Sequence, residues 1–224
     1  MGTREQQLLA QGVKFLPWVG KYYERGIGYD NDGNLCYGGK KVLVLGESHY
    51  YAEAETEQDL IDGAKNPNWT KGAINTLLHH PSGHTWPRTF HKFEHAIVGK
   101  PLNEGARQEF WDHLAYYNYV QALVGGPRET PKAKDLEEST DPFFAVLEEL
   151  RPDYIIAWGM RLYWNMPGKN GRPAEDIVEN EYRSRVYYYR VNQKDYPCLF
   201  LRHPSAPNFC IEPSHNAILR FMGA

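Results

Sequence analysis

The stretch KVLVLGESHY, residues 41–50, decides the fold class of this chain. Its first five residues form a short apolar run that contains β-branched valines, and the run stops at Gly46. Continuous apolar runs of this length are typical of strands that are buried on both faces of a parallel sheet. Two polar residues, Glu47 and Ser48, follow at once. The stretch therefore predicts a core strand whose carboxyl end leads directly into a polar loop.

Helix and strand patterns alternate on either side of this strand. Helices are expected where apolar residues recur at helical spacing or helix formers gather, over residues 52–66, 88–98, 104–113, 142–150 and from 213 onward. Strand-like runs are expected at residues 114–118, 154–158, 185–191 and 198–203. This order predicts an α/β fold, a three-layer α/β/α sandwich with a mostly parallel central sheet.

One helix start is expected in detail. Asp141 precedes Pro142, which offers an N-cap side chain followed by proline at the first helical position. This helix is expected to end before Arg151 and Pro152. Residues 125–134 are rich in glycine, proline and charge, so they are expected to form a loop.

Length and composition narrow the class of protein. A chain of 224 residues with ordinary apolar content is expected to form one domain over residues 1–224. No run approaches the ~20 apolar residues that cross a bilayer, and the N-terminus lacks the apolar segment of a signal peptide. We therefore expect a cytoplasmic protein with no membrane partner. The formal net charge of −3 gives no overall attraction to a polyanion and leaves a local basic patch as the route to nucleic acid.

Cysteines and histidines give no metal-binding pattern. The three cysteines are widely spaced and lack the paired spacing of zinc or iron–sulfur ligands: Cys36, Cys198 and Cys210. Histidines gather at 79, 80, 84, 91 and 95, where His91 and His95 have helical i, i+4 spacing but no third ligand follows. We expect no metal, no iron–sulfur cluster and no other cofactor. The oligomeric state stays open.

Polar clusters follow three of the predicted strands. They are residues 46–50, Asn118, and residues 203–205. Binding sites in parallel sheets gather at the carboxyl ends of strands, so these clusters are expected to face one cleft. Gly46 would allow a sharp exit from its strand, Glu47 and Ser48 could orient water or a hydroxyl, and His203 could donate to a developing negative charge.

This pattern resembles the uracil-DNA glycosylase superfamily from residue 41 to about residue 205. GESHYY, residues 46–51, is similar to the family's first motif, typified by Gly-Gln-Asp-Pro-Tyr-His or Gly-Glu-Ala-Pro-Gly. HPSAPN, residues 203–208, is similar to its second motif, typified by His-Pro-Ser. Asn118 stands where the family carries an asparagine that reads the pyrimidine edge. LEELRPDYIIAWG, residues 147–159, resembles the helix and strand that usually follow.

The resemblance implies a glycosylase-like fold. It also implies an activity, hydrolysis of the N-glycosidic bond of a damaged or deaminated base that is flipped out of DNA. It implies that Asn118 bonds the base edge and that His203 stabilises charge on the departing base. Gly46 and Glu47 would line the pocket, and Tyr50 would crowd the position of a thymine methyl group.

Further contacts are expected around these residues. Arg202, directly before His203, is the candidate for a phosphate contact, and Ser205 belongs to the second motif as a substrate-binding residue. A flipped base also needs an aromatic face, which stabilises binding by ~1–3 kcal/mol. The candidates for this face are Trp69, Trp86 and Phe90.

The sequence departs from the family at four points. Ser48 occupies the position of the water-activating aspartate of the best-known branch, which leaves Glu47 as the only carboxylate in the motif. Pro and Gly, which shape that loop in the family, are replaced by His49 and Tyr50. The four cysteines of the cluster-containing branch are absent. The usual intercalating leucine is missing as well, and Phe209 is the candidate for its role.

Three functions follow from these observations. The first is base excision, with Glu47, Ser48 and His203 as catalytic residues. The second is a nucleic-acid or nucleotide-binding module on the same fold without catalysis. The third is a small-molecule hydrolase that uses Glu47 and His203. A nucleophilic Ser48–His49 pair is not expected, because adjacent residues rarely face each other.

Overall fold

Four parallel strands form the centre of the fold, and antiparallel strands extend it on both sides. The computed structural model describes residues 2–79, 85–127 and 129–223. Within these residues the main sheet has eight strands in the order β1-β6-β4-β8-β12-β11-β10, with β9 paired to β11. They are β1 (Trp18–Val19), β4 (Val42–Gly46), β6 (Ala115–Asn118), β8 (Tyr154–Trp158), β9 (Gly171–Pro173), β10 (Ile177–Glu179), β11 (Tyr182–Val191) and β12 (Lys194–Leu201). β4 runs parallel to β6 and β8, and β12 runs parallel to β8.

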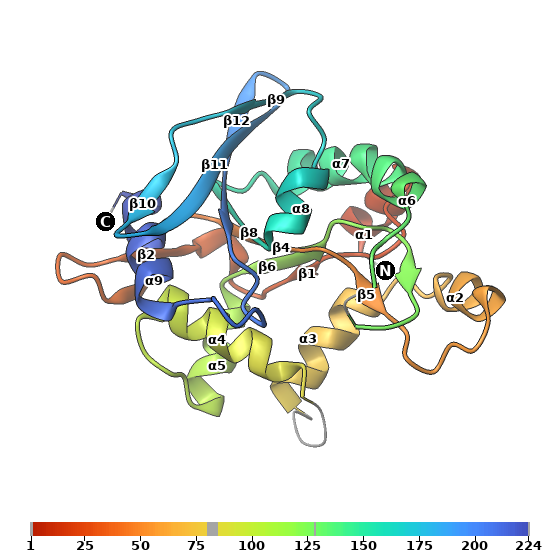
Figure 1. Ribbon diagram of the computed structural model, residues 1–224, viewed down its shortest axis with the longest axis horizontal. Coiled ribbons are helices and arrows are strands. Elements are labelled where there is room, and N and C mark those ends of the chain that lie inside the picture. Colours follow the sequence, from red (N-terminus) through yellow and green to blue (C-terminus); the bar gives the residue numbers. More distant parts are fainter. Residues whose placement is uncertain (1, 80–84, 128, 224) are drawn as a thin grey trace.

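Helices cover both faces of this sheet (Figure 1). One face packs against α1 (Thr3–Ala10), α6 (Ala133–Glu138), α7 (Thr140–Leu150) and α8 (Met160–Asn165). The other packs against α3 (Trp69–His79), α4 (Pro87–Val98), α5 (Glu104–Asp112) and α9 (Ile211–Met222). The predicted α/β architecture, with a central mixed sheet between helices, is therefore present.

The apolar run of β4 supplies both cores. Leu43 and Leu45 belong to one core cluster, and Val42 and Val44 belong to the other. All four side chains are fully buried. Successive side chains of a strand point to opposite faces, so a strand between two helical layers needs apolar residues at every position.

Smaller elements border the sheet. β2 (Ile27–Tyr29) pairs with β3 (Leu35–Tyr37), β5 (His49–Tyr50) pairs with β7 (Leu123–Val124), and Tyr23–Arg25 form a short 3-10 helix, η1. α2 (Glu57–Gly63) begins at a capping box, in which the side chains of Thr56 and Asp59 each accept a hydrogen bond from the other's backbone N–H. Among the described residues, no helix is long and apolar enough to cross a membrane.

The predicted helices and strands are present, but several of their details differ. The helix expected over residues 52–66 spans only Glu57–Gly63, and the loop expected over residues 125–134 ends where α6 begins at Ala133. α7 begins at Thr140, and Asp141 is not its N-cap, because α6 leads into α7 through Ser139. The strands expected at residues 185–191 and 198–203 pair antiparallel as β11 and β12, since a tight turn with positive φ at both Asn192 and Gln193 joins them. α9 begins at Ile211 rather than at Pro213.

A buried ion pair fastens α4 to α5. The Nε atom of Arg107 lies 3.0 and 2.8 Å from the two carboxylate oxygens of Glu94. The indole N–H of Trp111 donates to the same carboxylate at 2.9 Å. Glu94 is only 1% exposed, so its charge depends on these partners rather than on water.

Replacement of Glu94 by glutamine tests this pair. Glu94→Gln leaves the Arg107 guanidinium buried without a counter-charge, so the free energy of unfolding is expected to fall by about 3–5 kcal/mol. Urea unfolding monitored by circular dichroism measures the loss. The control is Glu24→Gln, because Glu24 pairs with Arg4 at the surface and its loss is expected to cost less than about 1 kcal/mol. Equal losses in the two variants would contradict a stabilising role for the buried pair.

Candidate functional site

Parallel pairing brings the polar residues that follow four neighbouring strands to one edge of the sheet. Gly46 pairs with Asn118 at the ends of β4 and β6, and Leu201 pairs with Trp158 at the ends of β12 and β8. Glu47, Gly159 and His203 therefore follow their strands at the same edge as Asn118. We call the group formed by Asn118, Glu47, His203 and Arg161 of α8 the strand-end site.

Asn118 is held against Gly46. It is 3% exposed, and its Oδ1 accepts a hydrogen bond from the hydroxyl of Tyr116 at 2.8 Å. A Cβ atom on Gly46 would overlap both Oδ1 of Asn118 and the Tyr116 hydroxyl, so only glycine fits at this position. Burial raises the pKa of Tyr116, which keeps its hydroxyl protonated as the donor. Because no described residue hydrogen-bonds the Nδ2 amide of Asn118, this group is the free donor of the side chain.

Ser205 fixes the orientation of the His203 ring. The backbone N–H of Ser205 donates to Nδ1 of His203 at 3.2 Å, and the Ser205 hydroxyl lies 2.7 Å from the same nitrogen. Nδ1 therefore carries the lone pair, and the neutral ring carries its proton on Nε2. Burial lowers the pKa of His203, an effect that the nearby Glu47 carboxylate opposes and the Arg161 guanidinium reinforces. At neutral pH His203 thus presents an uncharged Nε2–H donor.

Trp158 and Gly159 provide the support for His203. The rings of Trp158 and His203 meet edge to face with their centroids 6.2 Å apart. Gly159 has a positive φ of 98°, and a Cβ atom there would lie 3.6 Å from the His203 side chain. The backbone can therefore turn from β8 into α8 directly beside the histidine.

Arg161 binds Glu47 with both arms of its guanidinium group. Its Nε lies 2.8 and 3.0 Å from the two carboxylate oxygens, and its Nη2 also bonds Oε2. The same guanidinium donates to the Thr130 hydroxyl and the Glu129 carbonyl oxygen, both at 3.3 Å. The Glu47 side chain is only 12% exposed. The carboxylate is thus fixed in place beside a permanent positive charge, an arrangement that the sequence analysis did not anticipate.

A set of aromatic rings connects Asn118 to His203. The Tyr116 ring lies 5.5 Å from that of Trp158, and Phe90 of α4 packs against both, at 5.3 and 5.1 Å. Trp86 in turn lies 5.4 Å from Phe90. Of the three stacking candidates, Phe90 and Trp86 therefore belong to this group.

Two other aromatic candidates lie elsewhere. Trp69 donates its indole N–H to the carbonyl of Gly63 and contacts Tyr51, away from the strand-end site. Phe209 is 8% exposed and packs in the core beside α9, so the prediction of an intercalating wedge at this residue is wrong. A residue that inserts between bases must project from the surface.

The remaining residues of the first motif lie in different surroundings. The Nε2 atom of His49 lies 2.9 Å from the Thr70 hydroxyl, so His49 is tied to α3 rather than to Ser48. Tyr50 is 37% exposed and lies in β5, where it pairs with Val124 of β7. Ser48 is half-buried. The structure therefore brings Gly46 and Glu47 to the strand-end site and directs His49 to a structural role.

The predicted phosphate contact, Arg202, and two lysines of the predicted loop over residues 125–134 have partners within the protein. The Arg202 guanidinium donates to the Asn208 carbonyl at 3.1 Å and lies 4.6 Å from the centre of the Tyr182 ring. Lys132 pairs with Glu57, and Lys134 pairs with Glu138. Arg128 lies outside the described residues.

The histidine cluster gives no described metal site. His80 and His84 lie outside the described residues. In the rest of the chain, no group of three His, Cys, Asp or Glu side chains could hold a metal ion. Cys198 is buried in the core, whereas Cys36 and Cys210 are exposed.

The sequence matches no protein-family model and no curated protein. The geometry of the strand-end site, together with the motif resemblance, is therefore the basis for a functional assignment.

The pH dependence of stability tests the structural role of His49. Burial lowers the pKa of His49 to about 3, below the ordinary value of 6.5. Between these two pH values His49 binds a proton in the unfolded chain but not in the folded protein. The contribution of neutral His49 to the free energy of unfolding is therefore fully present above pH 6.5 and is lost as the pH falls towards 3. Between pH 6 and 4.5, wild type should lose up to ~1.4 kcal/mol per pH unit more than His49→Gln. Urea unfolding at each pH measures the free energy of unfolding of both proteins. If it changed with pH by the same amount in both, the prediction of a neutral, buried His49 would be contradicted.

Proposed function

We propose that this chain is a uracil-DNA glycosylase-like protein that binds an altered nucleobase at the strand-end site and hydrolyses its N-glycosidic bond. One observation carries the proposal: the free amide donor of Asn118 and the neutral Nε2–H donor of His203 lie at the same edge of four adjacent parallel strands. The positions of the two motif segments, directly after β4 and β12, support the resemblance to that superfamily.

Asn118 supplies base recognition in this proposal. A buried amide whose orientation is fixed by Tyr116 presents Nδ2 to a base carbonyl and a remaining lone pair of Oδ1 to a base N–H. A site built to hydrogen-bond a ligand rejects ligands that leave its buried polar groups unpaired. The absence of a side chain at Gly46 keeps the amide accessible.

His203 stabilises the leaving base. As the bond between the sugar C1′ and the base nitrogen breaks, the electron pair moves into the base and negative charge gathers on its carbonyl oxygen. A neutral histidine that is already oriented by Ser205 donates a hydrogen bond to that oxygen without reorganisation. The lowered pKa of His203 keeps it neutral at physiological pH.

Glu47 orients the attacking water. The water oxygen adds to C1′, one of its protons is accepted by the Glu47 carboxylate, and this proton finally neutralises the released base. A carboxylate has about four lone-pair positions, so Glu47 retains acceptor capacity beside its contacts to Arg161. Arg161 acts as a positioning residue, because it holds the carboxylate at the strand end.

The pairing of Glu47 with Arg161 also favours a second candidate function, base binding without cleavage. The Arg161 guanidinium engages both carboxylate oxygens of Glu47, which leaves fewer lone pairs free to accept a proton from water. Ser48, at the position of the family's aspartate, adds a hydroxyl that is a much weaker base. Recognition by Asn118 and His203 is common to both candidates.

An abasic-site assay separates the two candidates. Duplex and single-stranded oligonucleotides that carry uracil or hypoxanthine are incubated with protein, and abasic sites are cleaved by alkali. Wild type is expected to release an altered base, and His203→Ala should reduce the single-turnover rate by about 10²–10³-fold because the developing charge loses its donor. Glu47→Gln should lose activity as well. His79→Ala, at an exposed histidine on α3, is the control and should retain the wild-type rate.

Fluorescence anisotropy with the same oligonucleotides completes the experiment. Binding that prefers the altered base and disappears in Asn118→Ala, without cleavage above background, would establish the binding function and overturn excision. Absence of both cleavage and base preference would overturn both candidates.

A further inference from the structure

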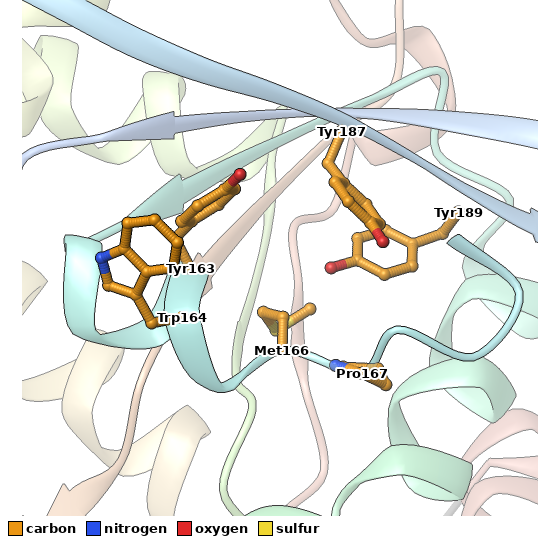
Figure 2. Close-up of a pocket in the computed structure, with 6 residues that line it drawn as sticks. All are labelled: Tyr163, Trp164, Met166, Pro167, Tyr187 and Tyr189. Atoms are coloured by element: carbon orange, nitrogen blue, oxygen red, sulfur yellow. The ribbon is translucent and has the colours of Figure 1, made fainter. Parts of the chain in front are cut away.

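An aromatic-walled cavity lies beside α8. It has a volume of about 130 Å³ and is lined by Tyr163, Trp164, Met166, Pro167, Tyr187 and Tyr189. Figure 2 shows these side chains arranged around a common space between the end of α8 and strand β11. We call it the aromatic cavity. Its lining includes none of the residues of the strand-end site, although α8 contributes to both.

The hydroxyl of Tyr189 is a polar group without a partner in this cavity. Tyr189 is 1% exposed, and no described residue forms a hydrogen bond with its hydroxyl. The hydroxyl points into the space between Tyr163 and Met166 (Figure 2). Burial raises the pKa of Tyr189, so the group stays protonated and can both donate and accept. Because this hydroxyl faces the cavity, a ligand there can form a hydrogen bond with it.

The size and walls of the cavity select a single ring. An apolar cavity of about 150 Å³ is sufficient to bind benzene. The walls offer π faces and a thioether, which pack favourably against the edge or face of an aromatic ring. The cavity volume of about 130 Å³ is close to this value, so its size is suited to a single ring.

Charge at the rim disfavours a cationic ligand. The Arg185 guanidinium lies 5.8 Å from the ring centre of Tyr163 and 5.9 Å from that of Trp164. It is held there by Asp176 at 2.7 Å. A cationic ligand would compete with this guanidinium for the same π faces and would be repelled by it.

We infer that the aromatic cavity binds a neutral, single-ring aromatic molecule that carries one hydrogen-bonding substituent, with that substituent on the Tyr189 hydroxyl. Phenol is the simplest molecule of this class. The inference does not depend on the function of the strand-end site.

Titration of the ¹⁵N-labelled full chain with phenol, toluene and tetramethylammonium tests the inference. The indole N–H signal of Trp164 is assigned by its absence in Trp164→Phe. Phenol should shift this signal saturably, and tetramethylammonium should not. Tyr189→Phe should weaken phenol binding about fivefold and leave toluene binding unchanged, because only phenol loses a hydrogen bond.

Trp164→Ala provides a variant that does not threaten folding, since Trp164 is 69% exposed. This substitution should weaken the binding of both phenol and toluene at least tenfold. Tyr37→Ala, at another exposed aromatic residue outside the cavity, should leave both affinities unchanged. No saturable shift with phenol, an unchanged affinity in Trp164→Ala, or tighter binding of tetramethylammonium than of phenol would each overturn the inference.

Discussion

The contact between Gly46 and Asn118 is the constraint on which the strand-end site depends. It exists only because β4 and β6 pair in parallel and end at the same register position. The same strand fills both cores with alternating side chains, so a shift of one residue would exchange the residues that face each helical layer. Core packing therefore fixes the register, and the register fixes where the Asn118 amide lies.

Electrostatics at the strand end divide the roles of the polar residues. Glu47 is bound by Arg161, whereas burial lowers the pKa of His203, an effect that the Glu47 charge opposes and the Arg161 charge reinforces. In the proposed function, the carboxylate accepts a hydrogen bond from water and the imidazole donates one to the leaving base. Under the proposed function, the strength of the Glu47–Arg161 pair distinguishes base excision from base binding. Since α8 also lines the aromatic cavity, a ligand there contacts the helix that carries Arg161.

Much of the fold follows from local sequence patterns. The apolar runs of β4 and β8 and the helical spacing of α4 predicted these elements within one residue, because each pattern reflects burial of a single element. The edge position of Asn118 and His203 was also predictable, since parallel strands end together. The family resemblance and the catalytic roles of Glu47, Ser48 and His203 stay proposals.

Other features depend on contacts between distant residues. Arg161 lies 114 residues from Glu47 in the chain, and no local signal connects the two. The Tyr116 hydroxyl determines the orientation of Asn118 only after the strand has formed. The antiparallel pairing of β11 with β12 depends on an Asn192–Gln193 turn that lacks the glycine usually found there.

The most direct measurement of the central claim is a crystal structure of the protein bound to DNA that carries deoxypseudouridine, whose carbon–carbon glycosidic bond resists hydrolysis. We expect a base flipped into the strand-end site, with base carbonyl oxygens within hydrogen-bond distance of Asn118 Nδ2 and His203 Nε2. A base that remains stacked in the duplex, or that binds away from these two groups, would contradict it.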